Sequence, residues 1–186
     1  IPASESFYIR QANTALDLDK HPYGTKSGPN LQFFRSLKKA IELSFVNGVI
    51  LMEVDAYPVK HAWLREINSR TSCLQNEAYV VGATAEEEVV PSIRTHLNGN
   101  AIYLIRNKGF KDFLDSWEKA LLEELKTSRD LAYDVILAWR NTNLEAGARK
   151  VDLLRDAYES KAIEVPRLIM NLGNAAGRFE TVGDLA

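Results

Sequence analysis

Apolar residues recur at helical spacing in two long segments of the chain, residues 31–45 and residues 109–125. The positions between them are mostly charged or polar, as in an amphipathic helix that packs one face on a core. The apolar positions are Leu31, Phe34, Leu37, Ile41 and Phe45 in the first helix, and Phe110, Phe113, Leu114, Trp117, Leu121 and Leu125 in the second.

The flanking residues predict where the first helix begins and ends. A loop rich in glycine and proline covers residues 23–29, and Asn30 is predicted to cap the helix that follows. Asn47 and Gly48 indicate its C-terminal end. Further helices are predicted at residues 62–67 and 151–162.

Short apolar runs at residues 49–52, 78–81, 101–105 and 166–172 predict strands. The first run has no polar face, so we expect a central strand buried on both sides. Strands that alternate with helices indicate an α/β fold with a mainly parallel central sheet.

Composition narrows the class of protein. The chain has 186 residues and a formal net charge of -2, which fits one domain over residues 1–186. It has no basic block that would indicate nucleic acid binding. Its one cysteine, Cys73, predicts a reducing compartment such as the cytoplasm. No apolar run approaches the roughly 20 residues of a membrane span.

Two carboxylates stand one residue apart where the first predicted strand ends, Glu53 and Asp55. Residues i and i+2 of an extended strand point the same way, so both can share one ligand. Open α/β sheets bind ligands at the carboxyl ends of their strands, and hard cations prefer oxygen ligands. The alternative is a pair of solvated charges at a strand end.

Residues 26–30, the helix after them and residues 49–55 together resemble one block of the GT-A glycosyltransferases. The resemblance implies an α/β/α sandwich in which the acidic motif holds Mn²⁺ or Mg²⁺ against the diphosphate of a nucleotide sugar, a UDP-sugar in preference to a GDP-sugar. It implies that Lys26 and Asn30 contact the donor. Glutamate at the first acidic position, Glu53, departs from the family pattern, so Asp55 is the stronger candidate ligand.

The turn formed by Asn98, Gly99 and Asn100 resembles the one that lines the pocket for the donor sugar and the acceptor in this family. Asparagine amides both donate and accept hydrogen bonds, which suits sugar hydroxyls. The alternative is a structural turn, because Asn-Gly is a strong turn signal.

Asp134 lies in the apolar run of residues 131–139, where a charge has to be paired or face a polar cleft. This segment resembles the helix start that carries the general base of inverting GT-A enzymes, and Asp134 is the candidate base. Asp130, just before the run, is predicted to cap the helix.

The resemblance implies a single catalytic domain that transfers a sugar to a glycan or glycoprotein. The chain is also similar to algal and large-algal-virus glycosyltransferases, in which such a domain is one module of a longer protein. Two alternatives stay open: a Mg²⁺-dependent phosphohydrolase or nucleotidyltransferase, which usually needs further acids for a second metal, and a non-catalytic α/β binding module.

Overall fold

The fold is given by a computed structural model. It describes residues 24, 26–53, 56–58, 60–74, 76–82, 97, 99–127, 130–136, 160–164 and 169–171.

The described part of the chain is built around a four-stranded sheet with the order β1-β4-β3-β5. These strands are β1 (Val49–Ile50), β3 (Val80–Gly82), β4 (Ile102–Tyr103) and β5 (Ala162–Glu164). β4 is antiparallel to both β1 and β3, and β5 is parallel to β3, so β1, β3 and β5 run in one direction. A second sheet pairs β2 (Ala56–Pro58) with β6 (Ile169–Asn171) in antiparallel orientation.

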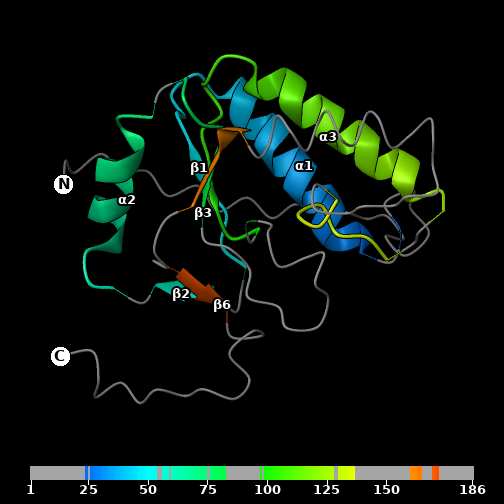
Figure 1. The fold of residues 1–186 in the computed structure, drawn as a ribbon, viewed down its shortest axis with the longest axis horizontal. Coiled ribbons are helices and arrows are strands. Elements are labelled where there is room, and N and C mark those ends of the chain that lie inside the picture. The colour runs from blue at the N-terminus through cyan, green and yellow to red at the C-terminus, as the bar shows by residue number, and fades with distance from the viewer. Residues whose placement is uncertain are drawn as a thin grey trace.

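Helices cover both faces of the larger sheet (Figure 1). α1 (Ser27–Glu42) and α3 (Phe110–Glu124) lie side by side on one face, and α2 (Trp63–Thr71) lies on the other. Alternate residues of β4 divide between the two cores, because successive strand residues point to opposite faces. Tyr103 packs with α1 and α3, whereas Ile102 packs with Ile67 of α2.

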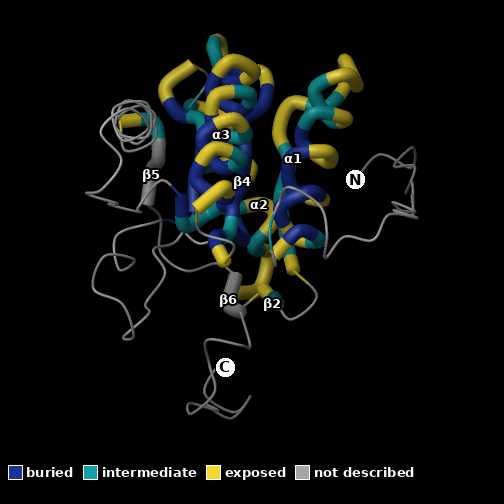
Figure 2. The backbone as a smooth tube through the Cα atoms, turned by 90° about the vertical axis from the view of Figure 1, so that its right-hand side faces the viewer, coloured by how far each residue is buried: buried dark blue, intermediate teal, exposed yellow. Residues whose placement is uncertain are grey.

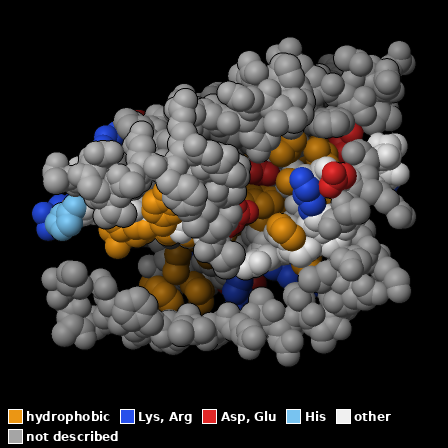
Figure 3. Space-filling model, turned by 90° about the horizontal axis from the view of Figure 1, so that it is seen from below, with side chains coloured by type: hydrophobic (Ala, Val, Ile, Leu, Met, Phe, Trp, Pro, Cys, Tyr) orange, Lys and Arg blue, Asp and Glu red, His pale blue; other side chains and the backbone are white. Residues whose placement is uncertain are grey.

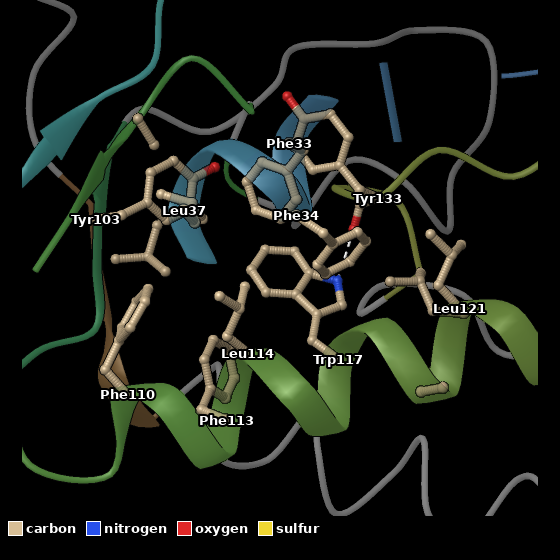
Figure 4. Close-up of a cluster of buried hydrophobic side chains, with 14 of the residues drawn as sticks. Phe33, Phe34, Leu37, Tyr103, Phe110, Phe113, Leu114, Trp117, Leu121 and Tyr133 are labelled. Atoms are coloured by element: carbon tan, nitrogen blue, oxygen red, sulfur yellow. Dashed lines mark hydrogen bonds between the residues drawn. The ribbon is translucent and has the colours of Figure 1, made fainter. Parts of the chain in front are cut away.

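The larger core is aromatic (Figure 4). The ring of Phe33 on α1 lies edge-on to Trp117 of α3 at a centroid distance of 5.0 Å, and edge-on to Tyr103 at 5.3 Å. At the margin of this core, Lys38 of α1 forms ion pairs with Glu118 and, at 3.2 Å, with Asp115 of α3. Figure 2 shows the burial of residues along α1 and α3, in which buried positions face inward and exposed positions face outward.

The prediction for α3 is confirmed. All six apolar positions predicted for it are buried. The helix begins after Gly109, whose φ of 86° is readily accessible to glycine. A side chain there would also meet the Tyr79 hydroxyl, 2.5 Å from the position of a Cβ.

The predicted bounds of α1 are wrong at both ends. The helix begins at Ser27, so Asn30 lies within its first turn and does not cap it. Pro29 is tolerated there because the first amides of a helix have no intrahelical partner. The helix ends at Glu42, before Asn47, and Phe45 is 72% exposed where the pattern predicted burial.

The side chain of Arg106, in the turn after β4, binds the chain where α1 ends. The guanidinium of Arg106 donates to the carbonyl oxygens of Ile41 at 2.9 Å, Leu43, and Val46 at 2.8 Å. The last carbonyls of a helix need such partners, and a cation there also complements the helix dipole.

The strand predicted at residues 49–52 is shorter than expected and half-buried. β1 stands at one end of the described sheet, where it pairs with β4. The strands predicted at residues 78–81 and 101–105 are present as β3 and β4, and the pattern missed β2. Residue 162, predicted as helical, belongs to β5.

Two expectations reach beyond these elements. The described sheet is mixed, and a mainly parallel sheet for the whole α/β/α fold stays a prediction. Within the described residues, no helix has the length and apolar character needed to cross a membrane.

Glu124, in the last turn of α3, is 3% exposed, and its Oε2 atom has no hydrogen-bond partner within the described residues. Burial raises the pKa of this carboxyl above its usual value. The charged form of this carboxyl is therefore less stable in the folded protein than in the unfolded chain. The free energy of unfolding is highest below the unfolded-state pKa and falls as pH rises through the folded-state pKa.

We therefore expect Glu124→Gln to be more stable than the unmodified protein at pH 7, by on the order of 1 kcal/mol. This advantage should shrink as pH falls toward about 4. Urea unfolding between pH 4 and 8 measures it, with the exposed neighbour substitution Glu123→Gln as the control. An advantage that grows on acidification would contradict the assignment.

Candidate functional site

The turn at Gly99 and Asn100 continues the pairing of β1 with β4. After the last paired residues, the Leu51 amide donates to the Ala101 carbonyl at 3.0 Å. The next amide on that side, from Glu53, donates at 2.7 Å to the side-chain Oδ1 of Asn100. The Asn100 side chain thus continues the hydrogen bonding between the two segments beyond the strands, and it fixes the position of the Glu53 backbone.

The side-chain amide of Asn100 also holds the Glu53 side chain. Asn100 Nδ2 donates to Glu53 Oε2 at 3.1 Å. Asn100 is 8% exposed, whereas Glu53 is exposed. One buried amide therefore orients a solvent-facing carboxylate through its backbone and its side chain together.

Gly99 receives a second carboxylate, from a segment 35 residues further along the chain. Its amide donates to Asp134 Oδ2 at 3.2 Å, and Asp134 is half-buried. The Gly99 carbonyl accepts a hydrogen bond from the Tyr103 hydroxyl at 3.0 Å. The turn is thereby tied to the core on one side and to a carboxylate on the other.

Tyr133 fills the space beside Gly99. A Cβ on Gly99 would lie 2.2 Å from the Tyr133 hydroxyl oxygen. Burial raises the pKa of Tyr133, and the negative charges of Asp134 and Glu53 raise it further. The phenol therefore stays protonated, and the charges of both carboxylates act on the same hydroxyl group.

Asn30 holds the backbone of the segment that carries these groups. Its Nδ2 atom donates to the Leu131 carbonyl at 3.0 Å, and its Oδ1 atom accepts from the Tyr133 amide at 2.8 Å. The Asn30 side chain is fully buried, with 0% exposure. Residues 133–136 form a turn where the sequence pattern predicted a helix.

The structure thus brings together five residues predicted from the sequence, directly or through these contacts: Asn30, Glu53, Gly99, Asn100 and Asp134. Lys26 is exposed at the N-terminal end of α1. Asp55 and Asn98 lie outside the described residues.

Tyr133 is the site residue that the sequence pattern missed. Its position within the segment of residues 131–139 gives it no separate role in the sequence pattern. An aromatic residue with a polar end, placed directly before a charge, is the signal that could have identified it.

The donor chemistry of this site suits a hard divalent cation. The described part of the site holds the carboxylates of Glu53 and Asp134. Acidic side chains lie beside apolar ones on the face of the molecule seen in Figure 3. No group of three or more histidine, cysteine, aspartate or glutamate residues within the described part of the chain is placed to hold a metal. Mg²⁺ is commonly held by one or two carboxylates together with substrate phosphates. The exposed carboxylate of Glu53, which Asp55 follows two residues later in the sequence, fits such an open site.

Comparisons with protein-family models, with curated proteins and with solved structures found no match for this chain.

The contact between Gly99 and Tyr133 leads to a stability prediction. Gly99→Ala should lower the free energy of unfolding by about 1–3 kcal/mol, because the new methyl group overlaps the phenol. Tyr133→Phe should recover part of this loss in the double variant, since it removes the atom in closest contact. Urea unfolding of the two single variants and the double variant measures the coupling.

Gly48→Ala is the matched control. A Cβ there would meet its nearest neighbours, the Tyr103 carbonyl oxygen and Leu104 Cδ2, at 3.4 and 3.6 Å. We expect a change within about 0.5 kcal/mol. Equal losses at Gly99 and Gly48 would show that the phenol does not restrict residue 99.

Proposed function

We propose that this chain is a metal-dependent glycosyltransferase that moves a sugar from a nucleotide-diphosphate donor to a hydroxyl group of a glycan or glycoprotein. A UDP-sugar is favoured over a GDP-sugar. The observation that carries the proposal is the attachment of two carboxylates from distant segments, Glu53 and Asp134, to the adjacent residues Asn100 and Gly99.

The donor side of the proposal rests on the end of β1. Glu53 is exposed there and is oriented by Asn100, and Asp55 follows two residues later. These two carboxylates would hold Mn²⁺ or Mg²⁺, which supplies positive charge to the diphosphate leaving group. Lys26 would contact the phosphates.

The turn at residues 98–100 would bind the donor sugar. Asn98 offers a side-chain amide that can donate to and accept from sugar hydroxyls. The amide of Asn100 already bonds to Glu53, so its part would be to set the edge of the sugar pocket. Gly99 lets the chain pass close to Tyr133.

Asp134 is the proposed general base. A base has to stand within hydrogen-bond reach of the acceptor hydroxyl at the reacting carbon. The Gly99 amide fixes one of its carboxylate oxygens. The charges of Asp134 and Glu53 both raise the pKa of Tyr133, which supports a base close to the donor side. A reducing compartment such as the cytoplasm suits the exposed thiol of Cys73.

Metal-dependent donor binding is the first test. With Mn²⁺ present, a UDP-sugar should raise the melting temperature. A ligand at about 100 times its Kd adds about 2.7 kcal/mol, or roughly 5–10 °C for a domain of this size. The rise should vanish with EDTA and in Asp55→Ala. Thermal shift measurements with UDP-sugars and GDP-sugars separate the donors.

Asp112→Asn, at an exposed acid in the first turn of α3, is the control and should keep the full response. An undiminished rise in Asp55→Ala would contradict the metal assignment. A metal-dependent rise with inorganic phosphate and none with any nucleotide sugar would favour a phosphohydrolase.

The second test concerns the base. Asp134→Asn should lower kcat by about 10²–10⁴, because only the transition state uses the proton acceptor. Donor binding, measured by the same thermal shift, should change little. Asp130→Asn, an exposed carboxylate four residues earlier, is the matched control. Equal losses of turnover in both variants would count against Asp134 as the base.

A further inference from the structure

The buried amide of Asn30 joins two segments that lie more than one hundred residues apart. Its partners are the Leu131 carbonyl and the Tyr133 amide, at sequence separations of 101 and 103. Asparagine can satisfy both because its side chain carries a donor and an acceptor. Loss of the amide would leave a buried carbonyl and a buried N–H group without this partner, which costs about 1–3 kcal/mol for each unsatisfied group.

We propose that Asn30 is a positioning residue, which acts through the backbone of residues 131–133 to hold the Asp134 carboxylate at the Gly99 amide. The resemblance to glycosyltransferases implied a donor contact for Asn30, and the geometry points to this second role. It deepens the proposed function, on which its catalytic meaning rests.

Asp134 follows Tyr133 directly, so the direction of its side chain depends on the backbone at Tyr133. That backbone has two anchors: Asn30 accepts from its amide, and Trp117 Nε1 donates to its carbonyl at 2.7 Å. The Tyr133 ring is stacked on Phe33 at a centroid distance of 3.9 Å, which fixes the Tyr133 side chain as well as its backbone.

Asn30 differs from Trp117 and Phe33 in what it restrains. Trp117 binds a carbonyl, and Phe33 contacts a ring, whereas Asn30 bonds to the backbone of both Leu131 and Tyr133. It therefore sets how the segment enters the turn. Without it, the remaining anchors should keep the turn in place while the contact between Asp134 and Gly99 loosens.

The Gly99 amide reports this contact directly. In a ¹H–¹⁵N spectrum, its signal should move in Asp134→Asn, because the amide loses a charged acceptor. Asn30→Ala should move it in the same direction, and the double variant should move it no further. Asn30→Ser keeps an uncharged hydroxyl that can donate or accept one hydrogen bond, so it should give a smaller displacement and serves as the test if Asn30→Ala does not fold.

Gln32→Ala, at an exposed position on the same helix, is the matched control and should leave the Gly99 signal unchanged. The Val81 amide in β3 serves as an internal reference, because a purely structural loss of stability would leave the native position of both signals as it was. An unmoved Gly99 signal in both Asn30 variants, or additive displacements in the double variant, would overturn the proposal.

Turnover separates this proposal from the proposed function. If both hold, Asn30→Ala should lower kcat roughly 10–100-fold with little change in the Kd of the nucleotide sugar, as expected for a misplaced reacting group. Displacement of the Gly99 signal without any nucleotide-sugar binding by the unmodified protein would leave Asn30 as the positioning residue and reject the glycosyltransferase.

Discussion

The ring of Phe33 joins the segments that form the candidate site. It belongs to α1 and contacts β4 through Tyr103, α3 through Trp117, and the turn at residues 133–136 through Tyr133. Truncating such a buried aromatic side chain typically costs 3–5 kcal/mol. Truncation here would also disturb the candidate site, because Tyr133, the residue directly before Asp134, stacks on this ring.

The polar groups lie at the margin of this aromatic core, and their surroundings differ in a graded way. Asn30 and Tyr133 are buried, Asp134 is half-buried and Glu53 is exposed. Burial raises the pKa of Tyr133, and the charges of Asp134 and Glu53 raise it further. Charges beside an apolar core interact more strongly than they would in water. A site fixed before ligand binding spends little free energy on rearrangement, which is the basis of electrostatic preorganisation.

The sequence predicted the elements whose structure is decided locally. The apolar face of α3 could be read completely, since its periodicity and its glycine start agree with its packing. Glu53, Gly99, Asn100 and Asp134 could be selected as polar groups near strand ends or within apolar runs. Their mutual contacts depend on the register of β1 against β4, which the local pattern does not encode.

The failures at α1 have the same cause. The spacing of Phe45 continues the helical pattern, yet the carbonyls at and just beyond the end of α1 bond to Arg106, 60–65 residues away. Asn30 has the propensity of a helix cap, but its partners lie on the turn before Asp134. β2 was missed because its pairing partner, β6, comes more than one hundred residues later.

The two attachments of α1 close loops of different length. Arg106 reaches the C-terminal end of the helix across 60–65 residues, and Asn30 finds its partners across 101 and 103. Closing the longer loop costs more entropy, and contacts between distant residues slow folding. A growing chain can therefore secure the C-terminal end of α1 before residues 131–133 exist. Until they arrive, the amide of Asn30 and the face of Phe33 that stacks on Tyr133 lack these contacts, whereas Tyr103 and Trp117 can already pack on Phe33. The candidate site would therefore assemble after the core between α1 and α3.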